Sequence, residues 1–590
     1  MSTTVGKCND VSIDFIVRDT DPEMEAVEDD IKGDLAKIGI KVNSRFLNDE
    51  DYIDAELNGN FNVLFTRTWG APYDPHSYFS SWAVPSHVEY SAIGNLQPPL
   101  TKEILFKKID DVQKELNPQA IQEQWREILD DVHQQALFMP LWGTRVPFVI
   151  NRRLVGFVPG DQSWAFPLNS VQVVEGSTTV TVCPGSGDLF TSVGNLNPHQ
   201  YSPNQLFAQD WIYEGLVSYG QDGQIVPSLA SSWLTELTTE GQRVTFKLRQ
   251  NVTFHDGTAF NCTVAKLNFD HVLSDIVKAR HQWYGAPRHL KSWVCNDAGD
   301  FVLETTTPFY PLLQELTYIR PLRFASASAF AKGFDSHPDF HNSCEPGAFG
   351  AKWDYLEDDV TCLGLTAPIG TGPFKYVSRE TNNGTDGRVF FARHDTYWGQ
   401  VPDIKNMVLV PYADTSEVEA ALLSGELDMT LGIGPLTAKQ VQDIKFTRSD
   451  KFDVLHGEVL QHALLVFNGN KAPTDDIQVR RAIIHAIDKA AFLEEEFAGL
   501  EQAATQLLPL TAPYCDIDLS PKWGFDLEKA MLINCPSTPP SDSLSAGAIA
   551  GIVIAVGVVV SLIAFVSHMI LRERSGKPMF TPPSKEAVQA

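Results

Sequence analysis

One segment near the start of the chain limits the fold class more than any other. Residues 11–17 alternate roughly between apolar and polar side chains, as a strand does. Asp21-Pro22 then offers a helix N-cap and a first-turn proline, and apolar residues follow at helical spacing as far as Ile38. Gly39 ends that helix and residues 40–42 resume a strand. A strand, helix and strand in this order predict an α/β fold, in which helices cover both faces of a sheet.

Cap signals place further helices along the chain. Asn117-Pro118 starts one, Asp414 with Glu417 resembles a capping box before a second, and Asp475 opens a third. Between about residues 177 and 391 the pattern changes to short strands and turns, such as residues 243–249. The chain therefore combines α/β units with a strand-rich region.

Composition excludes several classes of protein. A chain of 590 residues with 43% apolar side chains is globular and long enough for two or three domains. Its formal charge of −28 argues against nucleic-acid binding, which needs a basic face. Gly370-Thr-Gly372 lacks the lysine of a phosphate loop, and no nucleophile elbow or zinc-protease pair occurs. An enzyme is not expected.

Cysteine usage and acceptor tripeptides favour an oxidising compartment. The eight cysteines form no C-x-x-C pair, so a structural zinc site is not expected. Asn251, Asn261 and Asn383 each begin an N-glycosylation acceptor pattern, which predicts a glycoprotein. An even cysteine number and these patterns agree with a non-cytosolic protein.

A long apolar segment predicts a membrane anchor. Residues 546–571 carry no charge before Arg572 and are long enough to span a bilayer, after a Ser/Pro-rich stalk at 536–545. Arg572 and Arg574 follow, so the tail 572–590 is expected in the cytoplasm and the main domain outside, periplasmic, extracellular or luminal. The first ten residues show no apolar signal-peptide region. Two interpretations stay open, a lost N-terminus or a tail anchor.

Motifs in series carry a resemblance to a known family. In chain order these are Asn195-Leu-Asn-Pro-His199, Tyr213-Glu-Gly-Leu-Val217, Pro227-Ser-Leu-Ala-Ser-Ser-Trp233, Phe254-His-Asp-Gly-Thr-Ala-Phe260, Pro368-Ile-Gly-Thr-Gly-Pro-Phe374 and Tyr397-Trp-Gly399. Together they resemble the family 5 extracellular solute-binding proteins. The resemblance implies a two-lobed, type II periplasmic-binding-protein-like fold. Cys344 and Cys362 bracket a stretch that looks like an insertion relative to the family, and a disulfide that closes this loop is expected.

The order of the segments differs from that of the family. Residues 11–174 resemble the family's C-terminal part, whereas 195–532 resemble its beginning and middle, so the chain is predicted to be circularly permuted. The expected domains are lobe II in two parts (11–145 and 414–535) and lobe I (146–413), with a linker at 175–194 joining the family's old termini. The hinge is expected near 139–149 and 410–414.

Two motifs are similar to those of nickel-binding members of the family. They are Arg67-Thr-Trp-Gly-Ala-Pro-Tyr-Asp-Pro-His76 and Val84-Pro-Ser-His87. The resemblance implies a ligand-gripping Arg320, a metal-binding His87 and aromatic walls from Trp69, Tyr73 and Trp283. A family threonine does not carry over, and Trp164 occupies its place. Arg323 and His76 are interpreted as structural.

The chemistry of these residue types favours a chelated metal as the ligand. An arginine fork binds a carboxylate through two hydrogen bonds and repels a bare cation. One histidine leaves most coordination sites of nickel empty. The prediction is a solute-binding protein, with no obligatory cofactor, that captures nickel held by a small carboxylate chelator for uptake by an ABC importer. Two alternatives stay open: binding of short peptides in peptide transport, and an adhesion or structural role.

Overall fold

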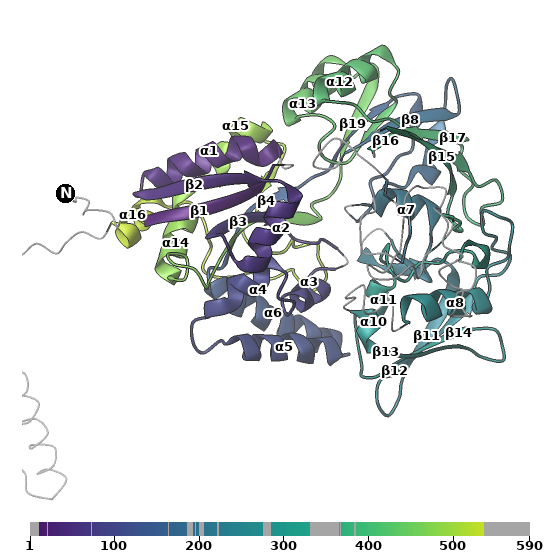
Figure 1. The fold of residues 1–590 in the computed structure, drawn as a ribbon, viewed down its shortest axis with the longest axis horizontal. Helices are drawn as coiled ribbons and strands as arrows, with labels where there is room; N and C mark the ends of the chain where they lie inside the picture. Colours follow the sequence, from purple (N-terminus) through teal and green to yellow (C-terminus); the bar gives the residue numbers. More distant parts are fainter. Residues whose placement is uncertain are drawn as a thin grey trace, which may run out of the picture. The chain divides into compact units, whose positions relative to one another are not determined.

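The protein is described here by a computed structural model. The residues that it describes are 11–19, 22–71, 73–162, 164–185, 193–194, 196–199, 206–220, 223–274, 285–330, 365, 367–382 and 385–535. Two large sheets organise them (Figure 1). We call residues 11–144 and 461–535 the six-strand lobe, and residues 147–456 the seven-strand lobe.

The sheet of the six-strand lobe joins strands that lie far apart in the sequence. Its order is β2 (Ile40–Leu47), β1 (Val11–Arg18), β3 (Val63–Arg67), β20 (Gln461–Phe467), β4 (Phe138–Thr144) and β21 (Gln502–Ala503). β1 pairs with β2 and β3 in parallel, whereas β20 runs antiparallel to β3 and β4. A strand from residue 461 onward therefore completes a sheet begun at residue 11.

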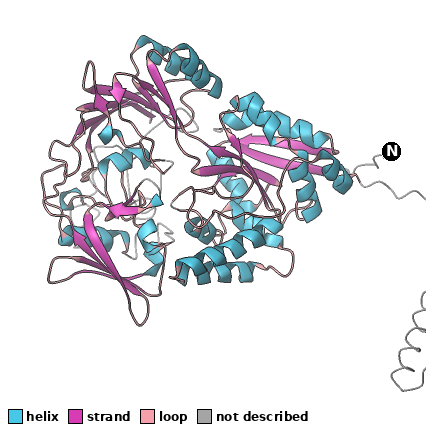
Figure 2. Cartoon of the chain, turned by 180° about the vertical axis from the view of Figure 1, so that it is seen from behind, coloured by secondary structure: helices cyan, strands magenta, loops and turns pink. Residues whose placement is uncertain are grey.

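Helices cover both faces of this sheet, as Figure 2 shows. Alternate strand residues face opposite ways, so Ile16 and Leu64 lie in one core cluster while Phe15 and Phe65 lie in another. The helices of the lobe are α1 (Pro22–Ala36), α2 (Asp49–Asn58), α3 (His76–Ser81), α4 (Val88–Ala92), α5 (Lys102–Lys114), α6 (Pro118–Gln134), α14 (Ile477–Ala486), α15 (Lys489–Phe497) and α16 (Leu527–Asn534). This is the α/β architecture that the β-α-β pattern predicts.

The seven-strand lobe contains two sheets of more than two strands. The seven-stranded sheet has the order β15 (Phe374–Asn382), β16 (Thr385–Arg393), β17 (Asn406–Leu409), β8 (Thr179–Pro184), β18 (Met429–Leu431), β5 (Pro147–Asn151) and β19 (Phe452–His456). The four-stranded sheet has the order β11 (Ala230–Leu237), β12 (Gln242–Leu248), β14 (Phe301–Thr305) and β13 (Leu290–Cys295).

Two small sheets and short helices complete the described part of this lobe. The small sheets pair β9 (Val217–Tyr219) with β10 (Ile225–Pro227) and β6 (Leu154–Val155) with β7 (Gln172–Val173). The helices are α7 (Leu206–Ile212), α8 (Cys262–Val272), α10 (Ala286–His289), α11 (Leu312–Glu315), α12 (Thr415–Ser424) and α13 (Ala438–Thr447).

The predicted helix starts are found within one residue of their positions. The Asn117 side chain accepts hydrogen bonds from the first turn of α6, and Asp414 caps α12. α14 is capped by Asp476, one residue later than predicted. Glu417 bonds the backbone of Ala413 instead of closing the capping box on Asp414.

The described chain passes between the two large sheets at two neighbouring places. β4 continues into β5 through Arg145 and Val146, and β19 continues into β20 through residues 457–460. The Gly457 N–H donates to the Val146 carbonyl at 2.9 Å, so the two passages lie against each other. We call these passages the neck. The first lies where the hinge was expected, whereas the second falls at 457–460 and not at 410–414, because β18 and β19 belong to the seven-stranded sheet. The boundary between the lobes that was expected at 413–414 therefore lies at 457–460.

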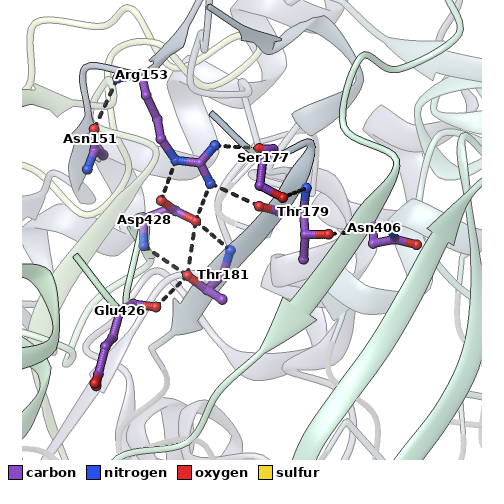
Figure 3. A network of polar contacts seen from close by, with 8 residues as sticks. All are labelled: Asn151, Arg153, Ser177, Thr179, Thr181, Asn406, Glu426 and Asp428. Atoms are coloured by element: carbon purple, nitrogen blue, oxygen red, sulfur yellow. Dashed lines mark hydrogen bonds and ion pairs between the residues drawn. The ribbon is translucent and has the colours of Figure 1, made fainter. Parts of the chain in front are cut away.

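Residues 179–184, within the linker expected at 175–194, form strand β8 of the seven-stranded sheet, and a buried ion pair ties this strand to its neighbours (Figure 3). The Arg153 guanidinium binds both carboxylate oxygens of Asp428, at 2.7 and 2.6 Å, and the carbonyls of Ser177 and Thr179. Asp428 also accepts the backbone N–H of Thr181 at 2.9 Å. Arg153 therefore fixes the chain as it enters β8.

A disulfide joins Cys262 at the start of α8 to Cys295 at the end of β13. Disulfides of this kind persist in oxidising compartments, in agreement with the cysteine pattern. The predicted Cys344–Cys362 pair lies outside the described residues. Of the glycosylation acceptors, Asn251 and Asn261 are exposed, and Asn383 lies outside the described residues.

The predicted membrane location is contradicted. The segment 546–571 lies outside the described residues, and none of the helices within them has the length and apolarity to cross a membrane. The longest of these helices, α6, has 17 residues and an amphipathic sequence, whereas a span needs about 20 predominantly apolar ones. The single-pass membrane assignment is therefore withdrawn.

Candidate ligand-binding site between the lobes

The loop between β3 and α3 carries two of the predicted site residues, Trp69 and Tyr73. Asp74 organises this loop from within: it is completely buried, and its carboxylate accepts the Gly70 N–H at 3.0 Å. Thr68 and the backbone of Trp69 also bind it. Burial outweighs these hydrogen bonds and raises the pKa of Asp74 to about 7. Gly70 has a φ of +85°, and a Cβ there would approach the Leu460 carbonyl to 2.9 Å, so this position requires glycine.

The structure brings Trp69, Tyr73 and His87 together. The Trp69 ring lies 6.3 Å from that of Tyr73, 5.9 Å from that of Tyr78 and 5.9 Å from that of His87. His87 precedes α4 and is half-buried. Burial lowers the pKa of His87, which favours the neutral imidazole that binds metals.

The seven-strand lobe meets this cluster through Tyr318. The Tyr318 ring packs edge-on against Tyr73, with ring centres 4.0 Å apart, and lies 5.8 Å from Trp164. Arg320 follows two residues later, half-buried and joined to Pro321 by a cis peptide bond. The predicted arginine thus belongs to a segment that touches the predicted aromatic wall. Trp283 lies outside the described residues.

Arg323 fixes the Tyr318–Arg320 segment through hydrogen bonds to backbone carbonyls. Its guanidinium is buried and donates to the backbone carbonyls of Tyr318 at 2.7 Å, Thr317 at 2.8 Å and Tyr213 at 3.1 Å. This geometry agrees with the interpretation of Arg323 as structural.

Direct contacts hold the two lobes against each other beside the cluster. The His76 Nε2 and Glu315 Oε1 atoms are 2.9 Å apart, and both side chains are buried. The Trp125 indole N–H donates to the Tyr310 hydroxyl at 2.8 Å, and the Tyr310 N–H donates to the Gln113 carbonyl at 3.0 Å. Contacts of this kind are those of two lobes closed on one another.

Sequence reasoning missed Tyr318, which touches aromatic rings from both lobes. The only signal for it was its place two residues before Arg320, in Tyr-Ile-Arg-Pro. Without the fold, an aromatic residue at that place is more simply interpreted as core.

Two lobes joined by a narrow neck, with aromatic residues at their contact, define a binding protein of the two-lobed type. The family model for bacterial extracellular solute-binding proteins, family 5 (Middle), matches residues 224–533. The chain therefore belongs to this family.

Individual relatives differ in what they bind. The nickel-binding periplasmic protein of Escherichia coli K12 is 30% identical over 339 residues, 58% of each chain. A glutathione-binding protein of Pectobacterium atrosepticum is 24% identical over 345 residues, again 58% of each chain. The crystal structure of NikA from Brucella suis in complex with Fe(III)-EDTA is 30% identical, with a TM-score of 0.47 over 60% of this chain and 63% of that one. The chain thus spans 58% of the length of these curated relatives.

Proposed function

We propose that this chain is a substrate-binding protein, not an enzyme, that captures a nickel ion wrapped in a small carboxylate chelator. The observation that supports the proposal is a series of ring contacts: His87 lies against Trp69, Trp69 against Tyr73, and Tyr73 against Tyr318, which is two residues before Arg320. The identity to the nickel-binding relative supports the choice of metal.

Each residue type has a separate part in this proposal. Arg320 grips the carboxylate of the chelator by paired hydrogen bonds, and its charge rejects the bare cation. His87, held neutral by burial, completes the coordination shell of the metal. Trp69, Tyr73 and, as predicted from the sequence, Trp283 form the walls that exclude water. An ABC importer is the expected recipient of the ligand.

Titration calorimetry on the full chain tests the proposal, with nickel alone and with nickel plus free histidine. We expect heat only with the chelator, and at least about tenfold weaker binding in Arg320→Ala, because a charge-assisted bidentate contact is lost. His87→Ala should weaken the nickel complex but not the chelator alone. Arg126→Ala, an exposed arginine on α6, serves as the matched control.

Short peptides are the alternative ligand, and the glutathione-binding relative is the observation that favours them. Binding of a dipeptide or of glutathione in the same titration, with no heat from the nickel–histidine complex, would replace the metal by a peptide and remove the role given to His87.

We also propose that the chain is circularly permuted relative to its family. Support comes from the six-stranded sheet, where β20, which falls inside the matched segment 224–533, pairs between β3 and β4 from residues 11–144. Two measurements test this. Tandem mass spectrometry of the protein from its native source should find a proteolytic peptide that runs through residues 171–182, which joins the two segments in the given order. A chain with residues 179–535 placed before 11–174 should bind the same ligand equally well.

A further inference from the structure

A second cavity lies beside the neck and is distinct from the site described above. Its volume is about 300 Å³, at the small end of the range for ligand pockets. Both lobes and the neck line it, with Arg145, Pro147, Thr415, Ile433, Gly434, Leu436, Thr437, Ala438, Val441, His456, Glu496, Phe497, Leu500 and Glu501. Some of these residues belong to α12, α13 and α15, which are labelled in Figure 1.

The wall from the seven-strand lobe and the neck is electropositive. Thr437 caps α13 with an uncharged side chain, so the partial positive charge at that helix N-terminus is not offset. Thr415 begins α12, whose N-terminus is partly offset by its cap Asp414. Arg145 adds a full positive charge from the neck.

His456 adds a polar atom that has no protein partner in the described part of the chain. Its Nε2 is buried there without a hydrogen bond. Burial, followed by the charges of Arg145 and Lys445, lowers the pKa of His456, so the ring is neutral at pH 7 and can donate or accept one hydrogen bond. A buried polar atom of this kind is stabilised when a ligand binds to it.

The opposite wall, from the six-strand lobe, is electronegative. α15 ends here at Phe497, and a helix C-terminus carries a partial negative charge. Glu501 accepts the Arg145 backbone N–H at 3.0 Å. Burial, followed by the negative charges of Asp30 and Glu495, raises the pKa of Glu496. A cation beside Glu496 would offset the repulsion among these carboxylates. The Gln442 side chain donates to the Ala498 carbonyl at 2.8 Å and links the two walls.

The remaining lining is apolar: Ile433, Leu436, Val441, Phe497 and Leu500. Positive charge from the neck and the start of α13, negative charge from the six-strand lobe and an apolar lining match a small zwitterion with an apolar side chain. We propose that this cavity binds a free α-amino acid of that class, with its carboxylate toward Arg145 and the start of α13 and its ammonium toward Glu496.

Such a ligand would bridge the two lobes at their joint. Any rotation of the lobes about the neck changes the distance between the two walls, so the amino acid favours one arrangement of the lobes. By linkage, it then changes the affinity of the main site, and the main ligand changes its affinity by the same factor.

Calorimetry with L-leucine on the full chain tests the proposal. We expect one site per chain. Two analogues that each lack one charge, 4-methylpentanoate and 3-methylbutan-1-amine, should bind at least about tenfold more weakly, since each loses one charge-assisted contact. Absence of L-leucine binding, or equal binding of either analogue, would overturn the proposal without any variant.

Variants locate the site. Arg145→Ala and Glu496→Gln should each weaken L-leucine at least about tenfold, whereas Glu494→Gln, an exposed glutamate of the same helix that does not line the cavity, should leave it unchanged. Glu496→Gln should also retain nickel–histidine binding, and Arg320→Ala should retain L-leucine binding. Loss of L-leucine in Arg320→Ala with retention in Glu496→Gln would place the amino acid in the main site and overturn the proposal. The expected results for L-leucine do not depend on whether the main site binds nickel.

Discussion

Asp74 is a single buried carboxyl on which the ligand-facing loop depends. It has no positively charged partner among the groups that set its pKa, and backbone and hydroxyl donors alone hold it. An acid held in this way is stabilised in its protonated form. Glu89, buried in α4 next to His87, also has a pKa raised to about 7 by burial. Trp69, Tyr73 and His87 therefore lie on a loop and beside a helix that each contain a buried carboxyl with a pKa of about 7.

Replacing Asp74 by asparagine should flatten the pH dependence of stability. Because burial raises the pKa of Asp74 from 3.8 to about 7, its stabilising contribution is complete below pH 4 and is lost as pH rises through 7. We expect wild type to lose on the order of 2 kcal/mol more than Asp74→Asn between pH 5 and 8. Urea unfolding at the two pH values measures the difference, and equal losses would contradict this assignment.

At the scale of elements, Arg153 and Asp428 show how three strands are joined without a covalent link. Their side chains are only 18% and 8% exposed, and together they bind backbone groups on either side of the start of β8. The neighbouring residue Arg152 pairs with Asp453, but those side chains are 52% and 45% exposed. Adjacent arginines thus occupy a buried and an exposed ion pair.

Truncating the two arginines should have different effects. Arg153→Ala leaves Asp428 buried without its partner and should cost roughly 3–5 kcal/mol of unfolding free energy. Arg152→Ala removes an exposed pair and should cost less than about 1 kcal/mol. Denaturant unfolding measures the free energy of unfolding of both variants. Similar losses would show that the buried ion pair stabilises the fold no more than the exposed one.

The Cys262–Cys295 disulfide should stabilise the four-stranded sheet and α8. It closes a loop with a sequence separation of 33, for which the entropy of the unfolded chain gives roughly 3–4 kcal/mol. Changing both cysteines to serine should lower the unfolding midpoint in the oxidised protein, and wild type under reducing conditions should match the double variant. No change in either would contradict a stabilising bond.

Local patterns predicted elements better than their partners in space. The β-α-β unit and the cap at Asn117 depend on neighbouring residues, so periodicity and cap chemistry were sufficient to locate them. The second neck passage lies more than 40 residues after its expected position. The sequence patterns of β18 and β19 identify them as strands but do not indicate which of the two large sheets they join. Tyr318 was missed for the same reason: its role depends on Tyr73, which lies in the other lobe.

At the scale of the whole molecule, the contacts around Tyr310 should favour the closed arrangement of the lobes. Tyr310→Phe leaves the buried Trp125 N–H without its acceptor and should shift the ligand-free protein toward open forms. Small-angle scattering should show a larger radius of gyration for this variant. Tyr52→Phe removes a hydroxyl that donates to Phe65 within one lobe, and it should leave the radius unchanged.

The neck is also part of a longer structure. Pro147 pairs with His456 on one side and Thr144 pairs with Gln461 on the other, so β4–β5 and β19–β20 form one antiparallel ribbon through both sheets. Only its middle is irregular, with two residues on one strand facing four on the other. A ribbon one layer thick bends readily across its flat face and resists bending within its own plane. The lobes should therefore rotate relative to each other about one preferred axis, which lies in the face of the ribbon and perpendicular to its strands.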